Sequence, residues 1–405
     1  MRERLVIVGS GMASGRMLEH LCRDTPDAFD VTLFGAEPHG NYNRIMLSPV
    51  LAGEECFENV VIHDAAWYAQ RKIACRFGET VTKIDRARKV VVSARGETPY
   101  DKLVLATGSV PFMLPVSGKD LPGVVAFRDF DDVETMLAAA VTPGANAVVI
   151  GGGLLGLEAA AALKKRGMNV VVLHLMSHPM ELQLDQEAGG YLQRALEARG
   201  IKIHCRAQTK AILGNELVEA VLLDDGTIYP ADLVVMAVGI RPETRIARDA
   251  GLHVERGIVV GDDMRSSDPD ILALGECAEH DSRCYGFVEP LYEMAPVAAR
   301  TLAGDEAAFR PEKNATNLKV TGLSVFSAGD FACAEEDCET LLLRDPGAGI
   351  YRKLVIRDGK LAGVVLFGDT ADSAWYLDLI RAGAPVSAMR DELAFGRALA
   401  MREAA

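Results

Sequence analysis

Short apolar runs alternate with longer helical stretches along the chain. Residues 5–8 and 31–34 have the length and the aliphatic, β-branched composition of buried strands, and residues 13–23 between them predict a helix. The same order returns about 140 residues later, where residues 147–150 predict a strand and residues 157–166 a helix. This alternation is typical of a doubly wound α/β protein with a parallel sheet.

Further strands complete two such units. They are predicted at residues 103–105, 170–173, 233–238 and 271–274. Residues 111–122 are rich in Pro and Gly and predict a linker, and residues 239–242 mark a second candidate boundary. After about residue 312 the character changes. Residues 318–326 and 352–367 predict strands and the tail from residue 373 a helix, which indicates a separate small α/β domain.

A glycine-rich turn joins the first strand to the first helix. It reads Gly-Ser-Gly-Met-Ala-Ser from residue 9, where Gly9 permits the tight turn and Gly11 lets the backbone approach a diphosphate. The free N–H groups and the positive end of the helix favour that anion. Ser14 takes the third position, which is usually Gly, and Glu37 after the second strand is expected to bind ribose hydroxyls. The alternative is a glycine turn without a ligand.

A second turn of this kind follows the strand at residues 147–150. Residues 151–156 read Gly-Gly-Gly-Leu-Leu-Gly, a full G-x-G-x-x-G between a strand and a helix, which is the context that the motif requires. His174, and not Asp or Glu, ends the next strand. A carboxylate there would favour the ribose diol of NADH and repel the phosphate of NADPH. The sequence therefore leaves NADH and NADPH open, and His174 either borders the ribose or ends the strand without a ligand contact.

Two such turns on separate units predict two dinucleotides. One enzyme class uses two, in which a nicotinamide donor reduces a flavin. We therefore predict an α/β fold with two Rossmann-like dinucleotide-binding domains and a small C-terminal α/β domain. The discontinuous FAD-binding domain comprises residues 1–116 and 240–312, and the inserted NAD(P)H-binding domain comprises residues 117–239. Residues 313–405 form the C-terminal domain, for dimerisation or partner docking.

Several further segments resemble the two-dinucleotide flavoproteins of the glutathione reductase type. They are Leu-Val-Leu-Ala-Thr-Gly-Ser at residues 103–109, Val-Met-Ala-Val-Gly-Ile-Arg-Pro at 235–242 and Ser-Asp-Pro-Asp-Ile-Leu-Ala-Leu-Gly-Glu at 267–276. The family usually has Gly-Asp at the last position, where the acid binds the ribitol of FAD. This chain has Gly275-Glu276, a conservative departure that should still reach a hydroxyl.

The resemblance narrows at residues 39–53, which read His-Gly-Asn-Tyr-Asn-Arg-Ile-Met-Leu-Ser-Pro-Val-Leu-Ala-Gly. With residues 149–158, 274–280 and 319–330, this segment is similar to the flavin domain of the large subunit of assimilatory NAD(P)H-nitrite reductases and to nitrate reductase electron-transfer subunits. Rubredoxin and ferredoxin reductases are close relatives. The large nitrite reductase subunit continues into iron–sulfur and sirohaem regions. This chain stops at Ala405 and has no clustered cysteines to hold such centres, so we expect that, if it serves nitrate or nitrite reduction, it is the separate reductase component and the metal chemistry lies on a partner.

The predicted cofactor-binding residues come from the two turns and from the segments that resemble the family. They are Gly9, Gly11, Met12, Ala13, Ser14, Glu37, Arg44, Ser48, Val81, Ala106, Thr107, Gly108, Gly151, Gly153, Leu154, Leu155, Gly156, Glu158, His174, Gly239, Gly275, Glu276 and Pro290. Arg44 and Ser48 are expected near the flavin or the pyrophosphate. The helix that starts near Pro290 either aims its N-terminus at the flavin ring or packs as an ordinary helix.

The predicted catalytic residues are Arg44 and Glu158. Enzymes similar to rubredoxin reductase carry a Lys at the position of Pro49, and this Lys pairs with the counterpart of Glu158. Because this chain has Pro49 instead, we expect Glu158 to pair with another group such as Arg44, or to be partly desolvated. A solvated carboxylate on the helix is the alternative.

Composition and charge narrow the class of partner. The chain has 405 residues, enough for two or three domains, and its net charge of −14 disfavours nucleic acid and anionic membranes. No apolar run in the sequence approaches the roughly 20 residues that cross a bilayer. The run at residues 5–8 is too short for the core of a signal peptide. We therefore expect a cytoplasmic protein without a membrane partner, as a monomer or a homodimer.

The eight cysteines are scattered, and the sequence has no Cys-x-x-Cys motif, so we expect free and mostly buried thiols. Cys333 and Cys338 lie in a polar stretch without two further clustered ligands, which predicts a surface loop and no metal site. The sequence also lacks the Cys pair of disulfide reductases and the single reactive Cys that peroxidase-type relatives carry in the segment at residues 41–47.

A redox protein therefore remains as the expected electron acceptor. It is the catalytic subunit of nitrate or nitrite reductase, or a carrier similar to rubredoxin or ferredoxin. One alternative is a rubredoxin or ferredoxin reductase of another pathway. A nucleotide-sensing flavoprotein without turnover is the alternative from a different class.

Overall fold

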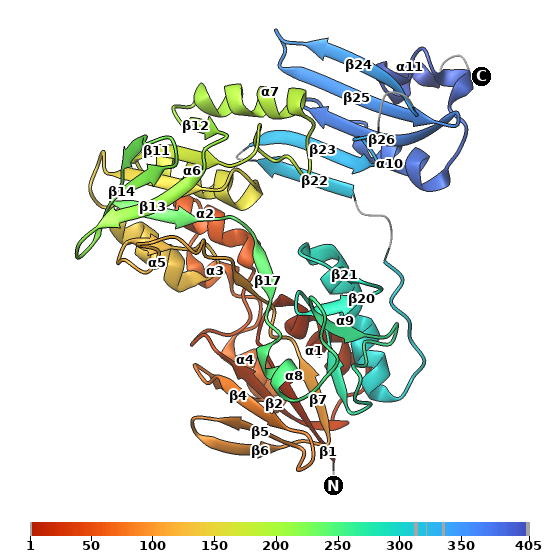
Figure 1. Cartoon of the computed structure of the whole chain (residues 1–405). Coiled ribbons are helices and arrows are strands. Elements are labelled where there is room, and N and C mark those ends of the chain that lie inside the picture. The colour runs from red at the N-terminus through yellow and green to blue at the C-terminus, as the bar shows by residue number, and fades with distance from the viewer. Residues whose placement is uncertain (1, 312–314, 321, 334–336, 402–405) are drawn as a thin grey trace. The chain divides into compact units, whose positions relative to one another are not determined.

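The computed structural model describes residues 2–311, 315–320, 322–333 and 337–401 of the chain (Figure 1). It divides into two compact units. The first comprises Met1–Val50, Glu54–Phe112 and Gly239–Pro311, and the second comprises Leu51–Gly53, Met113–Val238 and Glu312–Ala405. The inserted and C-terminal segments thus share one unit, and the predicted division into three domains stays a prediction.

A parallel sheet forms the centre of the first unit, with the strand order β19-β7-β1-β2-β3. Its strands are β1 (Glu3–Val8), β2 (Phe29–Gly35), β3 (Ala74–Phe77), β7 (Lys102–Leu105) and β19 (Ile271–Ala273). Leu5 pairs with Val31 of β2 and with Lys102 of β7. The apolar side chains of β1 and β7 are almost fully buried, as expected for a parallel sheet that is covered on both faces.

Helices and smaller sheets accompany this parallel sheet in the first unit, although the last two residues of the helix at Leu47–Ala52 belong to the second unit. Helix α1 (Met12–Asp24) packs against α9 (Val288–Ala303). The other helical elements are η1 (Arg44–Met46), α2 (Leu47–Ala52), α3 (Phe57–Val60), α4 (Ala65–Gln70) and α8 (Arg245–Asp249). The smaller sheets contain β4 (Val81–Asp85), β5 (Val90–Ser93) and β6 (Gly96–Pro99), then β8 (Ser109–Pro111) with β17 (Ile240–Pro242), and β18 (Ile258–Val260), β20 (Ala278–His280) and β21 (Arg283–Cys284).

A second parallel sheet lies in the second unit, with the order β12-β11-β10-β16-β9. Its strands are β9 (Val124–Val125), β10 (Asn146–Ile150), β11 (Asn169–His174), β12 (Lys202–Cys205) and β16 (Leu233–Met236). The helices of this part are α5 (Phe130–Ala139), α6 (Leu154–Lys165) and α7 (Gln186–Glu197). A three-stranded sheet of β13 (Thr209–Gly214), β14 (Val218–Leu223) and β15 (Ile228–Pro230) completes it.

The C-terminal part of the second unit is an antiparallel sheet with the order β22-β23-β26-β25-β24. Its strands are β22 (Ala315–Val320), β23 (Leu323–Gly329), β24 (Glu339–Asp345), β25 (Ile350–Arg357) and β26 (Lys360–Phe367). Helix α10 (Ser373–Ala382), η2 (Ser387–Met389), η3 (Leu393–Phe395) and α11 (Arg397–Ala400) follow it. The strands predicted within residues 318–326 and 352–367 are confirmed, and each range contains parts of two antiparallel strands.

The segment at residues 111–122 differs from the predicted linker. Met113, Leu114, Val116 and Leu121 pack against the core of the second unit. Gly118 has a φ of +81°, and a β-carbon there would overlap the carbonyl oxygen of Ile212. The Pro and Gly residues of this segment therefore belong to a packed stretch of chain and not to a flexible linker. The boundary between the two units falls between residues 112 and 113.

Cys333 and Cys338 form a disulfide between β23 and β24, with their Cα atoms 6.3 Å apart. The expectation of free thiols was wrong for this pair. A spacing of five residues with polar neighbours does not reveal whether a turn brings two Cα atoms within disulfide range.

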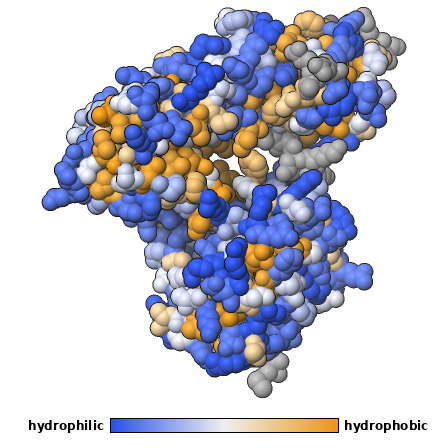
Figure 2. Space-filling view, viewed as in Figure 1, coloured by the Kyte–Doolittle hydropathy of each residue, from blue (hydrophilic) through white to orange (hydrophobic). Residues whose placement is uncertain are grey.

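Large apolar side chains are exposed on the second unit. They include Val141, Leu155, Leu175, Met176, Leu182, Leu217 and Ile228. Figure 2 shows apolar surface in the area where Figure 1 labels β13 and β14. Within the part of the chain that the structure describes, no helix is both long and apolar enough to span a membrane.

Candidate functional site

The first glycine turn lies at the carboxyl end of β1. Gly9 has a φ of +111°, and a β-carbon there would overlap the carbonyl oxygen of Ala106. Gly11 is the N-cap of α1, and a β-carbon there would have no described atom within 4 Å. The first turn of α1 consists of uncharged residues, so no carboxylate there offsets the positive potential of the helix N-terminus. We call the open space at Gly11 and the N-terminus of α1 a cradle, and it fits the pyrophosphate of a dinucleotide.

Glu37 follows β2 at the same edge of the sheet. The Tyr42 hydroxyl donates a hydrogen bond of 2.6 Å to Oε2 of Glu37, and the Arg44 guanidinium pairs with Oε1. Arg44 also lies over the Tyr42 ring, 5.0 Å from the ring centroid. These contacts hold a half-buried carboxylate at the position where a ribose acceptor was predicted.

The ends of β7 and β19 complete this edge. A β-carbon on Gly275 would lie 3.1 Å from the β-carbon of Ala13, so the turn after β19 touches the start of α1. Glu276 accepts a hydrogen bond of 2.7 Å from the Ser109 hydroxyl. Thr107, in the turn after β7, donates a hydrogen bond of 2.6 Å to the carbonyl of Glu243. The predicted residues on four strands therefore meet at the carboxyl edge of one parallel sheet, around its topological switch point.

Cys277 directly follows this group and is fully buried. Its thiol donates to the carbonyl oxygens of Leu274 and Leu105, at 3.3 and 3.5 Å. Burial raises the pKa of this thiol, so it stays protonated and a poor nucleophile. Cys277 therefore packs against and hydrogen-bonds to the residues at the carboxyl ends of β7 and β19, and it is not a reactive thiol.

The remaining predicted residues of this unit lie on other elements. Ser48 lies in α2, and Val81 begins β4. Helix α9 begins at Val288, so buried Pro290 lies in its first turn. Gly239 has a φ of +117°, and its carbonyl accepts from the Phe112 N–H at 2.9 Å. Their roles toward a cofactor stay predictions.

The second glycine turn follows β10 and repeats the first. A β-carbon on Gly151 would overlap the carbonyl oxygen of Ala237, and one on Gly156 would overlap that of Gly151. By contrast, a β-carbon on Gly153 would have no described atom within 4 Å. Gly153 is the N-cap of α6, whose first turn continues with uncharged Leu154 and Leu155. The open space again fits a pyrophosphate.

His174 ends β11 beside this turn, and its side chain is only 7% exposed. Its Nδ1 accepts the Gly152 N–H at 3.0 Å. Its Nε2 lies 3.0 Å from a carboxylate oxygen of Glu181. The imidazole thus faces the glycine turn, and it connects this turn to an acidic side chain of the following loop.

Glu158 is half-buried on α6 of the second unit, whereas Arg44 belongs to the first unit. Arg44 pairs with Glu37 within its own unit. The proposed pairing of Glu158 with Arg44, and the catalytic role of both, therefore stay predictions.

Sequence reasoning missed Tyr42, Ser109 and Glu181. Tyr42 and Ser109 carry hydroxyls inside the segments at residues 39–53 and 103–109 that resemble the family, which is a weak signal. Glu181 lies seven positions after the strand end, and only the path of the loop brings it to His174.

The sequence has matches to two protein families. Residues 3–301 match the pyridine nucleotide-disulphide oxidoreductase family. The chain belongs to this family. Residues 315–384 match the C-terminal domain of rubredoxin NAD+ reductase. Membership confirms the predicted family, the α/β fold with two dinucleotide-binding parts and the oxidoreductase class.

Relatives in this family agree over nearly the whole chain. A nitrite reductase [NAD(P)H] of Bacillus subtilis is 47% identical, over 95% of this chain and 48% of its own length. An assimilatory nitrate reductase electron transfer subunit of the same organism is 41% identical, over 93% of this chain and 49% of its own. The chain therefore spans about half the length of these relatives. A ferredoxin reductase structure from Rhodopseudomonas palustris has a TM-score of 0.84 and 26% identity, over 97% of this chain and 100% of its own.

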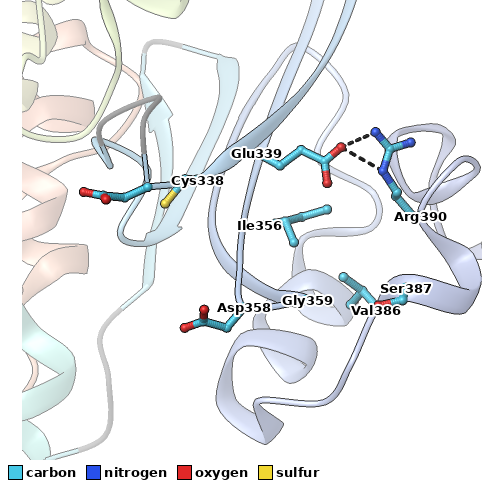
Figure 3. A pocket seen from close by; sticks show the side chains of 9 residues that line it. Cys338, Glu339, Ile356, Asp358, Gly359, Val386, Ser387 and Arg390 are labelled. Atoms are coloured by element: carbon cyan, nitrogen blue, oxygen red, sulfur yellow. Dashed lines mark hydrogen bonds and ion pairs between the residues drawn. The ribbon is translucent and has the colours of Figure 1, made fainter.

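A separate hollow of about 450 Å³ lies in the C-terminal sheet (Figure 3). Its lining includes Cys338, Glu339, Asp358 and Arg390, and Figure 3 shows the ion pair between Glu339 and Arg390. None of these residues belongs to either glycine turn. Among the described residues, no group of three or more His, Cys, Asp or Glu residues could hold a metal ion.

Proposed function

We infer that the chain is an FAD-dependent NAD(P)H oxidoreductase that passes electrons to a redox protein. Its role is that of the electron-transfer component of assimilatory nitrate or nitrite reduction. The observation that carries this proposal is the pair of open cradles at Gly11 and Gly153, each at the carboxyl edge of its own parallel sheet. Two cradles hold two dinucleotides, which an electron-transfer flavoprotein needs and a single-nucleotide enzyme does not.

The residues of the first unit fit FAD. Gly11 and the N-terminus of α1 would bind its pyrophosphate, and Glu37 would accept from ribose hydroxyls. Glu276 would accept from the ribitol while Ser109 holds one of its oxygens. Bound FAD would supply the conversion between a two-electron hydride donor and a one-electron protein acceptor.

The residues of the inserted part fit the nicotinamide dinucleotide. Gly153 and the N-terminus of α6 would bind its pyrophosphate, with Leu154 and Leu155 at the helix start. Cys277 lies at the proposed flavin site, but burial raises the pKa of its thiol. This argues against electron transfer through a reactive cysteine there. A protein acceptor fits this, and a relative that is 41% identical is named an assimilatory nitrate reductase electron transfer subunit.

A second candidate acceptor is rubredoxin or ferredoxin. The match of residues 315–384 to the C-terminal domain of rubredoxin NAD+ reductase favours this alternative. An anaerobic titration of the purified protein with NADH and NADPH, followed by turnover with each acceptor, separates the candidates. Bleaching of the flavin absorbance followed by reduction of a nitrate or nitrite reductase partner supports the main proposal. Reduction of rubredoxin alone supports the alternative, and a protein that binds flavin but is not bleached contradicts both.

A further inference from the structure

The carboxyl end of β11 is where a Rossmann fold places the group that meets the adenosine ribose. This chain has an imidazole there, so the strand end itself offers no acid. However, His174 is turned toward the backbone: its Nδ1 accepts the Gly152 N–H at 3.0 Å. A neutral imidazole with an accepting Nδ1 carries its proton on Nε2. That proton lies on the side of Glu181, whose Oε2 is 3.0 Å away.

We propose that Glu181, which lies beside His174, is the acid that selects NADH over NADPH in this chain. The inference rests on the proposed function and deepens it. Glu181 reaches the ribose position from the loop after β11, in place of the strand-end acid that the sequence lacks. Its side chain is 26% exposed, compared with 7% for His174, so the carboxylate and not the imidazole is the group that a ligand meets.

The burial of His174 Nε2 also indicates that Glu181, and not His174, is the group that meets the ligand. This atom is buried, and its contact with Glu181 is close but not aligned as a good hydrogen bond. The Glu181 carboxylate therefore keeps acceptor capacity for two adjacent hydroxyls. A ribose diol provides two donors for it, whereas a 2′-phosphate would place a second negative charge beside it.

The neighbouring side chains fit the adenosine end of the ligand. Leu175 and Met176 directly follow His174 and are 60% and 48% exposed, and Leu182 follows Glu181 and is 78% exposed. Exposed apolar residues in such a cluster suit a flat, apolar adenine ring. They give no preference between NADH and NADPH, so the charges at the ribose decide it.

Arg206 is a cation beside this loop that would oppose the preference. Arg206 follows β12, and its backbone N–H donates to the Met176 carbonyl at 3.0 Å. Its side chain is exposed and could meet a 2′-phosphate. The Glu181 carboxylate lies 3.0 Å from His174 at the strand end, whereas Arg206 contacts this loop through its backbone N–H. We therefore expect the acid to outweigh this cation.

The test compares two adenosine fragments on the FAD-loaded protein by calorimetry. ADP-ribose should bind at least about tenfold more tightly than its 2′-phosphate, because the 2′-phosphate would place a like charge beside the Glu181 carboxylate. Glu181→Gln should lower this ratio by about tenfold, mainly through tighter binding of the 2′-phosphate. Glu181→Asp should keep part of the preference. Glu216→Gln makes the same charge change in the hairpin between β13 and β14 and should leave the ratio unchanged.

The same variants are then compared by kcat/KM for NADH and NADPH. A wild-type protein that prefers the 2′-phosphate fragment overturns the inference without any variant. So does a Glu181→Gln protein with the wild-type ratio and an unchanged denaturation midpoint. Fragment binding needs no electron transfer. Failure of turnover with intact fragment preference would therefore count against the proposed function alone.

Discussion

Gly153 and Gly156 allow the ligand cradle to be separated from the packing of the fold. Both lie in the second glycine motif, five residues or fewer after Gly151. A β-carbon on Gly153 meets open space, whereas one on Gly156 would overlap the carbonyl oxygen of Gly151. The same chemical change, Gly to Ala, therefore has opposite expected effects at two positions three residues apart.

The Gly153→Ala protein should fold normally and bind poorly. Gly153 has φ −76° and ψ 177°, which Ala adopts without strain. Reduced freedom of the unfolded chain adds about 0.4–1 kcal/mol of stability. Ala is a poorer N-cap residue than Gly, and this loss of stability is similar in size to the gain. Stability should thus stay within about 1 kcal/mol of the wild type. The methyl group would occupy the path of the pyrophosphate, and losing one charge-assisted hydrogen bond, about 1.5–3 kcal/mol, weakens binding about 10- to 100-fold.

The Gly156→Ala protein should lose stability instead. Ala gains about 1 kcal/mol over Gly in a helix, but forced overpacking against backbone costs about 1–3 kcal/mol. Gly190→Ala in α7 is the matched control, because its β-carbon would meet only the flexible end of Arg194, at 3.4 Å. This control should be as stable as the wild type or more stable, and should bind normally.

The assay combines urea denaturation, followed by circular dichroism, with calorimetric binding of ADP-ribose. FAD content should be unchanged in Gly153→Ala, because the flavin residues belong to the other unit. Wild-type ADP-ribose affinity in Gly153→Ala would refute the assignment of this turn as the cradle. A loss of several kcal/mol of stability in that variant would refute the open space on which the argument depends.

Three further outcomes follow from the structure. The unreduced, unfolded protein should titrate as six thiols, because Cys333 and Cys338 form a disulfide, and a count of eight would contradict that bond. Tyr351→Phe should lower the unfolding free energy by about 1.5–3 kcal/mol, because the buried hydroxyl donates to the Asp185 carboxylate at 2.7 Å; equal urea midpoints would show that this bond contributes nothing. Burial lowers the pKa of His63 below its usual 6.5, so the unfolded state binds the proton first and stability falls as the pH drops below about 6.5. His63→Gln should flatten this slope between pH 5.5 and 7.5, whereas parallel curves would assign it to other groups.

Much of the fold could be predicted from the sequence. Apolar runs before and after each glycine turn specify buried parallel strands, because a strand covered on both faces needs apolar residues throughout. The smaller antiparallel sheets, such as β4-β5-β6, were not foreseen. The strands of this sheet have four or five residues, too short for a clear pattern of alternation.

What the sequence determined by itself is therefore local: two glycine turns, the strand and helix on either side of each, and the residues that start each helix. These follow from short-range sterics, since only glycine fits where a β-carbon would overlap a carbonyl oxygen. The tertiary structure decided which side chains meet there. It joined Glu37 to Tyr42, Glu276 to Ser109, and His174 to Glu181. Such pairs depend on where strand ends and loops lie in space, and spacing along the chain does not record that.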